Sequence, residues 1–304
     1  MNTNGTPKKV KYLNNRDLLS EIHKSKCSYS SFSKDEYSNY DIILNNLDKV
    51  NIRTIAQAKR NRAKRLSLLA FNEAKLKSSD KKLKLSDFAI DYKTIPKTDV
   101  VIRIMTFDHI PLAPGRKKTT KTRADSHEKV NFPPFQHWKF NEEDELVCVG
   151  KSHWKGGVKT GKFSRDHGRI TEGLGRMFIK LSERYAQRSN WRGYTYVDEM
   201  RGQAILQLSQ IGLQFDESKS ENPFAYYTAA VTNSFTRILN LEKKNQNIRD
   251  DLLEGAGMTP SNTRQSANEF AEENARQAQI YKNTRMPKST DTDYGEDETT
   301  PDEE

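Results

Sequence analysis

The sequence predicts a mainly α protein with a compact three-helix bundle, a small α+β insert and a disordered acidic C-terminal tail. Apolar residues recur at helical spacing in 169–250, and prolines interrupt 88–165. The last 16 residues, 289–304, contain eight acids and no Lys or Arg. Only 34% of the 304 residues are hydrophobic, and the mean hydropathy is −0.91. The core is therefore expected to be small for the chain length.

The predicted bundle occupies residues 166–255. Its first two helices carry apolar stripes made of Ile170, Leu174, Met177, Phe178, Leu181 and Tyr185, and then of Tyr196, Met200, Ala204, Leu208 and Ile211. The third helix is expected to begin at Asn222-Pro223, because Asn favours the N-cap and Pro the first helical position. The residues expected to face the core on this helix are Phe224, Tyr227, Val231, Phe235 and Ile238.

The remaining segments are assigned from N- to C-terminus. Residues 1–40 are expected to form a basic arm and a helix, with Asn15 as the N-cap. Residues 41–165 are expected to contain a basic helix at 41–78, followed by the insert. The insert is expected to contain a buried strand at 100–105 and two strands within 135–149. A further helix is predicted at 256–288, before the acidic tail.

Positive charge is concentrated in a few segments. The chain carries +10, which becomes +18 without the eight tail acids. Residues 51–85 contain eleven Lys or Arg, and 116–123 contain five with no acid. Such runs suit phosphate backbones, although solvated helix faces and membrane surfaces are alternatives. The expected nonspecific phosphate contacts are Arg60, Arg62, Lys64, Arg65, Lys117 and Lys118.

The outer face of the third helix has a composition unlike a face that serves solubility alone. It combines an aromatic residue, two amides and two cations without an acid, in the stripe Tyr226, Ala229, Asn233, Arg237, Asn240 and Lys244. Tyr can stack on an unpaired base, Asn can reach base edges, and Arg and Lys bind phosphates. The face therefore indicates nucleic-acid binding, with an ordinary polar helix face as the alternative.

Patterns for other functions are weak. No nucleotide-binding loop, nucleophile elbow or paired zinc motif occurs, and KGGVKTGK at 155–162 lacks the ending of a phosphate loop, so no enzyme, cofactor or metal is expected. Whether His137, Cys148, His153 and His167 converge on a metal is left open. Two cysteines favour a reducing compartment, and no apolar run is long enough for a membrane span, so we expect a cytosolic protein.

The segment 215–239, FDESKSENPFAYYTAAVTNSFTRIL, resembles the part of bacterial primary sigma factors that binds core polymerase, melts DNA and recognises the −10 element. Residues 169–255, including NLEKKNQN, and the N-terminal KYLNNRDLL are more similar to late-transcription sigma factors of large tailed phages. The longer versions from cyanophages also have an insert that resembles 48–165. The resemblance implies a sigma region-2-like bundle.

The resemblance also implies roles for individual residues. Tyr226 would stack on a flipped adenine beside Thr228, while Asn233, Thr236 and Arg237 would meet the upstream edge of the −10 element, with Asn240 and Lys244 continuing the DNA-binding face. Ala229 and Ala230 replace the tryptophan pair of primary sigma factors. The residues implied in binding the clamp coiled coil of the largest polymerase subunit are Asp198, Glu199, Arg201, Gln203 and Gln207.

The sequence as a whole therefore predicts a phage-type sigma factor that directs host RNA polymerase core to late promoters with an A/T-rich −10 element. Its expected location is the cytoplasm of the infected bacterium. The polymerase flap, a phage sliding clamp and a late coactivator are further candidate partners, although the acidic tail lacks the apolar clamp-binding peptide of the family. The alternatives are a basic RNA-binding regulator and a DNA-processing enzyme without a recognisable site.

Overall fold

The computed structural model describes residues 13–77, 83–113 and 126–285. The predicted N-terminal arm up to residue 12, Lys117, Lys118 and the acidic tail at 289–304 lie outside these described residues. The chain forms two compact units, 1–238 and 239–304. The described part is mostly helical with a small mixed sheet, as the sequence predicts.

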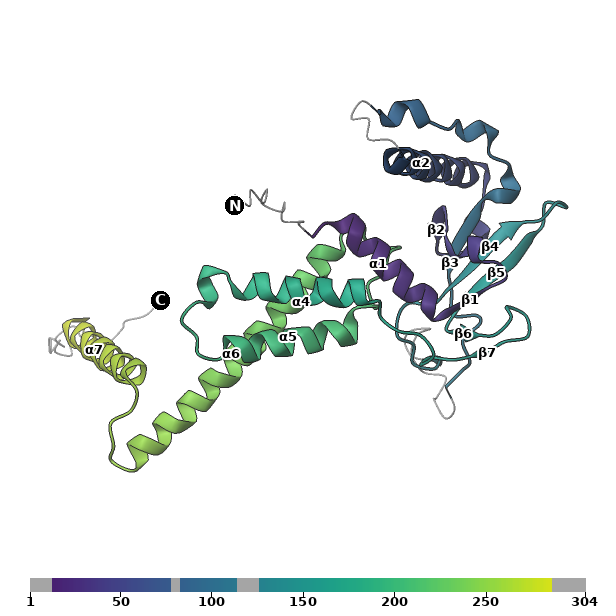
Figure 1. Cartoon of the computed structure of the whole chain (residues 1–304). Helices are drawn as coiled ribbons and strands as arrows, with labels where there is room; N and C mark the ends of the chain where they lie inside the picture. The colour runs from purple at the N-terminus through teal and green to yellow at the C-terminus, as the bar shows by residue number, and fades with distance from the viewer. Residues whose placement is uncertain (1–12, 78–82, 114–125, 286–304) are drawn as a thin grey trace, which may run out of the picture. The chain divides into compact units, whose positions relative to one another are not determined.

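Three helices pack together in the first unit, as the sequence predicts (Figure 1). They are α4 (Glu172–Ala186), α5 (Val197–Ile211) and the first turns of α6 (Pro223–Gly255). The predicted stripes supply the core, because the fully or almost fully buried side chains are Leu174, Phe178, Leu181, Tyr185, Met200, Ala204, Leu208, Tyr227, Val231, Phe235 and Ile238. Phe178 meets Tyr227 edge to face, with ring centroids 5.0 Å apart.

The start of α6 confirms one predicted cap and corrects one predicted core position. Asn222 Oδ1 accepts a hydrogen bond from the Ala225 amide at 3.0 Å, and Pro223 is the first helical residue. Phe224 is 38% exposed, so its assignment to the core was wrong. Its amide donates instead to Asn15 Oδ1 at 3.0 Å, which ties the first turn of α6 to the N-terminal helix.

Helix α1 (Asn15–Ser28) buries Leu18 and Ile22 and packs on α4. Its N-cap is Asn14, whose side chain accepts from the Asp17 amide at 2.7 Å. The predicted cap, Asn15, was therefore wrong by one residue; its side chain caps α6 instead.

A five-stranded mixed sheet forms the insert, in the order β1-β5-β4-β3-β2. The central strands β3 (Val101–Met105), β4 (Phe135–Phe140) and β5 (Leu146–Ser152) confirm the predicted ones. β1 (Ser30–Phe32) pairs antiparallel with β5, and β2 (Ile42–Leu44) pairs parallel with β3. Two edge strands thus come from segments that precede the predicted strands.

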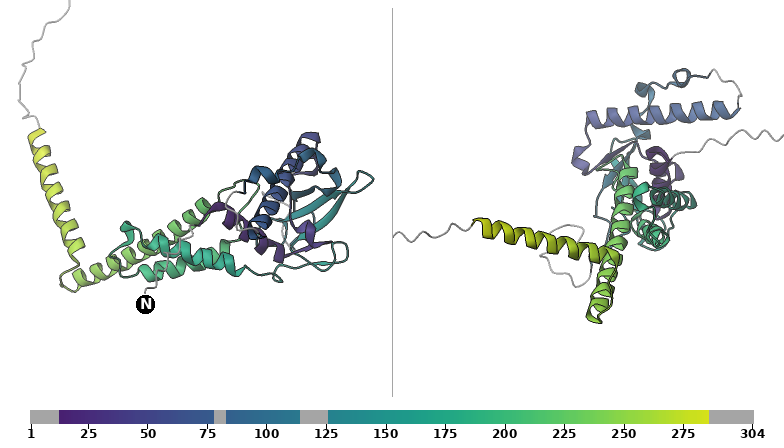
Figure 2. Two further views of the ribbon diagram at one scale, coloured as in Figure 1. Left: turned by 45° about the horizontal axis from the view of Figure 1, so that its top comes forward. Right: turned by 90° about the vertical axis from the view of Figure 1, so that its left-hand side faces the viewer.

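Helix α2 (Ile52–Lys77) lies across one face of the sheet (Figure 2). Ala58 packs with Ile102, Ile104 and Phe140 in the core between them. The predicted helix at 41–78 is confirmed from residue 52, and it was wrong for 42–49. That segment forms β2 and a 3₁₀ turn, η2 (Leu47–Lys49), because its apolar residues pair with β3 and pack against α2.

Short elements complete the described chain. Three 3₁₀ turns, η3 (Leu85–Phe88), η4 (Tyr92–Thr94) and η5 (Lys97–Asp99), precede β3, and η1 (Asp35–Ser38) follows β1. A small ribbon joins β6 (Trp154–Lys155) to β7 (Lys162–Phe163), and η6 (Ser189–Trp191) follows α4.

The second unit contains the end of α6 and helix α7 (Asn262–Arg285). The helix predicted at 256–288 is confirmed for 262–285 and was wrong for 256–261, which form the turn before α7. Gly257 has a φ of 72° in the turn between them, a conformation that favours glycine. Asp250 accepts from the Ser261 amide and hydroxyl at 2.9 and 2.7 Å, which fixes the entry into α7. None of the described helices is both long and apolar enough to cross a membrane.

Candidate nucleic-acid interface

A groove of about 310 Å³ lies between α5 and the first part of α6. Two residue sets that the sequence assigned to different partners meet in it. Its described lining contains no acidic residue and consists of Gln203, Gln207, Ile211, Tyr226, Ala229, Ala230, Asn233, Ser234 and Arg237. Ala229 and Ala230 keep the groove open, because larger side chains on this face of α6 would occupy it.

Tyr226 is half-buried at one side of the groove. Its ring is held edge to face by Phe215 and Tyr227, with centroid distances of 5.6 and 5.3 Å. Tyr227 is fully buried and donates its hydroxyl to the Gly212 carbonyl. Burial raises the pKa of Tyr226 above its ordinary value, so the phenol stays neutral. The ring is therefore positioned in advance and retains an accessible part.

Polar groups on α6 remain unpaired around the groove. The Ser234 hydroxyl is buried and has no hydrogen-bond partner among the described residues, and the same holds for Thr228 Oγ1. Asn233, Thr236 and Arg237 are exposed, and Arg237 forms no ion pair with the described part of the chain. Asn233, Thr236 and Arg237 are therefore accessible to a bound molecule, whereas the two unpaired hydroxyls are enclosed by the protein and cost folding free energy.

Helix α5 presents the predicted polymerase-binding residues on two surfaces. Gln203 and Gln207 are half-buried and line the groove with Tyr226. Asp198 and Glu199 are exposed in the first turn, outside the groove lining. Arg201 forms an ion pair with Asp198 at 3.2 Å. Asp198 and Glu199 can therefore bind a partner without involving the groove, whereas Gln203 and Gln207 share the groove with the residues of α6.

The predicted DNA-binding stripe continues beyond the groove. Asn240 and Lys244 are exposed on α6 after Ile238, in the second unit.

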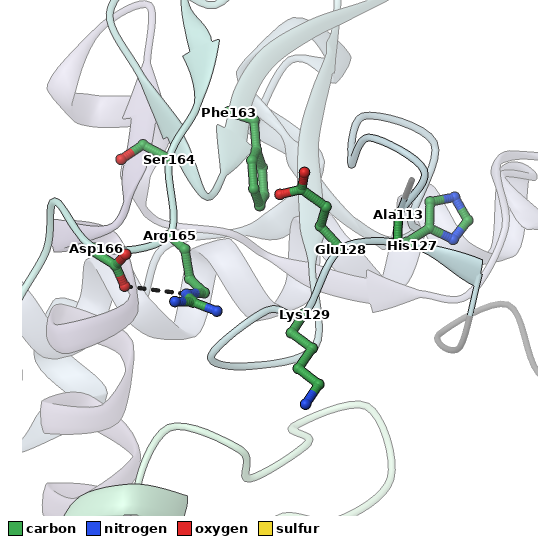
Figure 3. A pocket seen from close by; sticks show the side chains of 8 residues that line it. All are labelled: Ala113, His127, Glu128, Lys129, Phe163, Ser164, Arg165 and Asp166. Carbon is green, nitrogen blue, oxygen red and sulfur yellow. Dashed lines mark hydrogen bonds and ion pairs between the residues drawn. The ribbon is translucent and has the colours of Figure 1, made fainter. Parts of the chain in front are cut away.

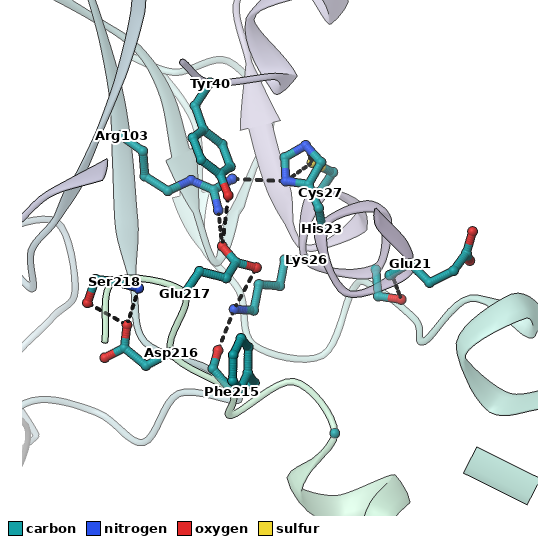
Figure 4. A network of polar contacts seen from close by, with 12 residues as sticks. Glu21, His23, Lys26, Cys27, Tyr40, Arg103, Phe215, Asp216, Glu217 and Ser218 are labelled. Carbon is teal, nitrogen blue, oxygen red and sulfur yellow. Dashed lines mark hydrogen bonds and ion pairs between the residues drawn. The ribbon is translucent and has the colours of Figure 1, made fainter. Parts of the chain in front are cut away.

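A buried polar network, which sequence patterns did not indicate, holds the loop before α6 (Figure 4). Glu217 lies at its centre and is contacted by cations from two other elements. Arg103 of β3 donates to Glu217 Oε2 at 2.6 Å, and Lys26 of α1 lies 3.3 Å from Oε1 and donates to the Phe215 carbonyl at 2.7 Å. The Tyr40 hydroxyl reaches Glu217 Oε2 at 3.4 Å. The network thus joins α1, the sheet and the α5–α6 loop.

Aromatic rings and two neutral histidines enclose Arg103. Its guanidinium lies between the rings of Tyr40 and Phe135, at 3.9 and 3.8 Å from their centroids. Arg103 Nε donates to His137 Nε2 at 2.9 Å, and His137 Nδ1 is 2.6 Å from the Tyr37 carbonyl, so the proton belongs on Nδ1. Burial, followed by the charge of Arg103, lowers the pKa of His23 to about 3.

The ionisation of the network follows from its burial and its two cations. Burial alone would raise the pKa of Glu217, but Lys26 and Arg103 outweigh it and hold that pKa below its ordinary value. Burial also keeps His137 neutral, since it lowers the pKa well below the ordinary range. One carboxylate therefore faces two cations, and its loss would leave both uncompensated.

The predicted phosphate contacts on α2 fall into two classes. Arg60 and Lys64 are exposed, although Arg60 lies over the Tyr92 ring at 5.1 Å. Arg62 and Arg65 are half-buried, and their guanidinium nitrogens lie 3.5 and 2.7 Å from the buried carboxylate of Asp41. The second pair therefore helps to hold α2 on the sheet.

This division predicts different results for two double variants. Arg60→Gln with Lys64→Gln should flatten the salt dependence of nonspecific DNA binding, lowering the slope of log affinity against log salt by roughly 2. Arg62→Gln with Arg65→Gln should instead lower the free energy of unfolding by about 1–3 kcal/mol, because Asp41 loses its charged partners. DNA titrations over several salt concentrations and urea unfolding measure both effects. Equal loss of stability in the two variants would contradict the division.

The histidines and cysteines considered as metal ligands have other surroundings. No group of three or more His, Cys, Asp or Glu side chains suited to a metal ion occurs in the described residues. His137 belongs to the Arg103 network, His153 is buried against Phe132, and His167 lies near the Ser164 carbonyl. Cys148 is on β5, where its thiol lies 3.5 Å from the Gly150 carbonyl.

No protein-family model, curated protein or solved structure matches this chain significantly.

Proposed function

We propose that this protein is a phage-type sigma factor, which binds bacterial RNA polymerase core and opens late promoters at an A/T-rich −10-like element. The observation that supports it best is the α5–α6 groove, in which a positioned Tyr226 lies beside amides, small residues and Arg237 without an acid. Its volume of about 310 Å³ is at the lower end of small-ligand pockets, a size suited to one unstacked base.

The chemistry of the lining matches a flipped adenine better than a phosphate alone. Side-chain amides offer a donor and an acceptor together, which pair with adenine, and Gln203, Gln207 and Asn233 supply three of them. Tyr226 supplies a face for stacking, and Arg237 a cation for the adjoining phosphate. A basic RNA-binding regulator would use the same groups on an RNA loop.

The direct test is transcription with purified polymerase core and this protein on phage late-promoter templates. Specific transcripts that require the protein and an intact −10 element support the proposal. Tight binding to single-stranded RNA without core-dependent transcripts would favour the RNA-binding alternative. In both cases the template without its −10 element is the matched control.

Polymerase binding should depend on the exposed first turn of α5. Asp198→Lys with Glu199→Lys reverses two charges outside the groove and should weaken the complex with core about tenfold or more, because complementary charges fix such docking. Glu172→Lys with Glu183→Lys, at two exposed acids of α4, is the matched control with the same change of charge. Co-purification of core with each variant measures the effect, and undiminished binding of the double variant would place the contact elsewhere.

A further inference from the structure

The β6–β7 ribbon places two lysines directly opposite one another. Lys155 pairs with Lys162 in the antiparallel register, and Trp154 pairs with Phe163. Side chains at directly opposed positions share a face with Cβ atoms about 5 Å apart, so the lysine pair and the aromatic pair lie on opposite faces. Lys159 adds a third exposed cation in the connecting loop. One face and one end of the ribbon are therefore cationic.

This placement does not stabilise the ribbon. Like charges at directly opposed positions repel each other, and Lys155, Lys159 and Lys162 form no ion pair with a described residue. The aromatic face, by contrast, is engaged in packing: the Trp154 indole nitrogen donates to the Gly157 carbonyl at 3.2 Å, and Lys151 lies over its ring at 4.6 Å. The lysine face is thus left for a partner that carries negative charge.

The ribbon is also rigidly held. Gly156 has a φ of 98°, and a Cβ on Gly161 would lie 2.6 Å from the carbonyl oxygens of Gly157 and Lys155, so the loop needs both glycines. The Trp154 amide donates to the Tyr29 carbonyl at 3.2 Å, and the Ser31 hydroxyl bonds to the Gly156 carbonyl. The backbone that carries the lysines is therefore fixed before any partner binds.

The groove behind β7 is a poorer anion site than the lysine face. It is lined by Phe163, Lys129 and Arg165, but also by Glu128 and by Asp166, whose carboxylate binds Arg165 at 3.2 Å (Figure 3). The two acids reduce its positive potential.

We propose that the lysine face formed by Lys155 and Lys162, together with Lys159 in the adjoining loop, binds the phosphate backbone of double-stranded DNA. A duplex carries one negative charge per about 1.7 Å of its axis, so several lysines held on one ribbon backbone can neutralise its phosphates together. Single-stranded partners are captured mainly by exposed aromatic rings, and this face presents none, since Trp154 lies on the other face and is already engaged. On this proposal the insert contacts DNA at a surface separate from the α5–α6 groove.

The test compares two triple variants with equal loss of charge. One changes Lys155, Lys159 and Lys162 to Gln, and the control changes the exposed Lys34, Lys49 and Lys93 to Gln. Binding of the full-length protein to a mixed-sequence DNA duplex is followed by fluorescence anisotropy at several salt concentrations. The ribbon variant should bind about tenfold or more weakly at low salt, with its log–log salt slope reduced by roughly 2–3. Its thermal stability should be unchanged or higher, because the lysine repulsion is removed.

Each other outcome overturns the proposal. Equal weakening in the two triple variants would mean that only net charge matters. A larger loss for duplex RNA, or for an acidic peptide, than for duplex DNA would assign the face to that partner. Because polymerase is absent from this experiment, loss of duplex binding in the ribbon variant would support the lysine face even if the sigma-factor proposal failed.

Discussion

Replacing Glu217 with Gln is expected to lower the free energy of unfolding by about 3–5 kcal/mol. The substitution removes the carboxylate that faces both Lys26 and Arg103, and these two cations would remain buried without an anion. Urea unfolding followed by far-UV circular dichroism measures the loss. Glu221→Gln is the matched control, because this exposed residue lies in the same loop and makes the same change of charge, and it should have almost no effect.

The same carboxylate gives a pH dependence with a defined sign. The folded pKa of Glu217 lies below its ordinary value of 4.5, so the unfolded chain takes up the proton first. Its contribution to stability is therefore fully present above pH 4.5 and is lost as the pH falls through the folded pKa. Adding Lys26→Met to Glu217→Gln should recover part of the stability, since one uncompensated cation is removed; a double variant less stable than Glu217→Gln would contradict this account.

On the proposed sigma-factor function, Tyr226→Ala is expected to impair promoter opening by roughly 5- to 150-fold, which corresponds to the ~1–3 kcal/mol of stacking on one base. Tyr226→Phe keeps the ring and should retain most of the opening activity. Binding to the closed promoter should change little in either variant, because it does not require an unstacked base. Permanganate footprints of the bubble and filter binding of the closed complex separate the two steps.

Packing has to be controlled in the Tyr226 experiment, because its ring contacts Phe215 and Tyr227. Thermal unfolding of each variant measures this contribution. Footprints of Tyr226→Ala as strong as those of the wild type, in a protein of normal stability, would exclude the stacking role. Weak footprints accompanied by loss of the fold would require Tyr226→Leu as a replacement, which keeps apolar volume without an aromatic face.

Much of the fold could be predicted because its signals are local. The four-three spacing of Leu174, Phe178, Leu181 and Tyr185 defines a buried helix face in any context, and the Asn222-Pro223 pair marks a helix start within two residues. The strand at 101–105 is apolar except for Arg103, and prolines at 96 and 111 flank it in the sequence. The buried helix face, the helix start and the strand each depend on residues only a few positions away in the sequence.

The errors arose where a distant partner decides the local structure. Ile42–Leu44 is too short to show a period, and it becomes a strand only because β3 pairs with it in parallel. Phe224 fits the apolar face of α6 in an isolated helix, but it lies in the first turn, where its amide is capped by Asn15 from α1 and its ring is 38% exposed.

For the candidate site, the sequence alone determined which residue types α6 presents, since helical periodicity separates Tyr226 and Arg237 from the buried Tyr227 and Phe235. The tertiary structure decided that Gln203 and Gln207 of α5 share a groove with them. It also decided that Glu217, which looks like a surface loop residue, is buried between Arg103 and Lys26, at separations of 114 and 191 residues. The spacing of charged residues in a sequence does not indicate which of them will pair. Only the packing of α1, the sheet and the α5–α6 loop could bring Glu217, Arg103 and Lys26 together.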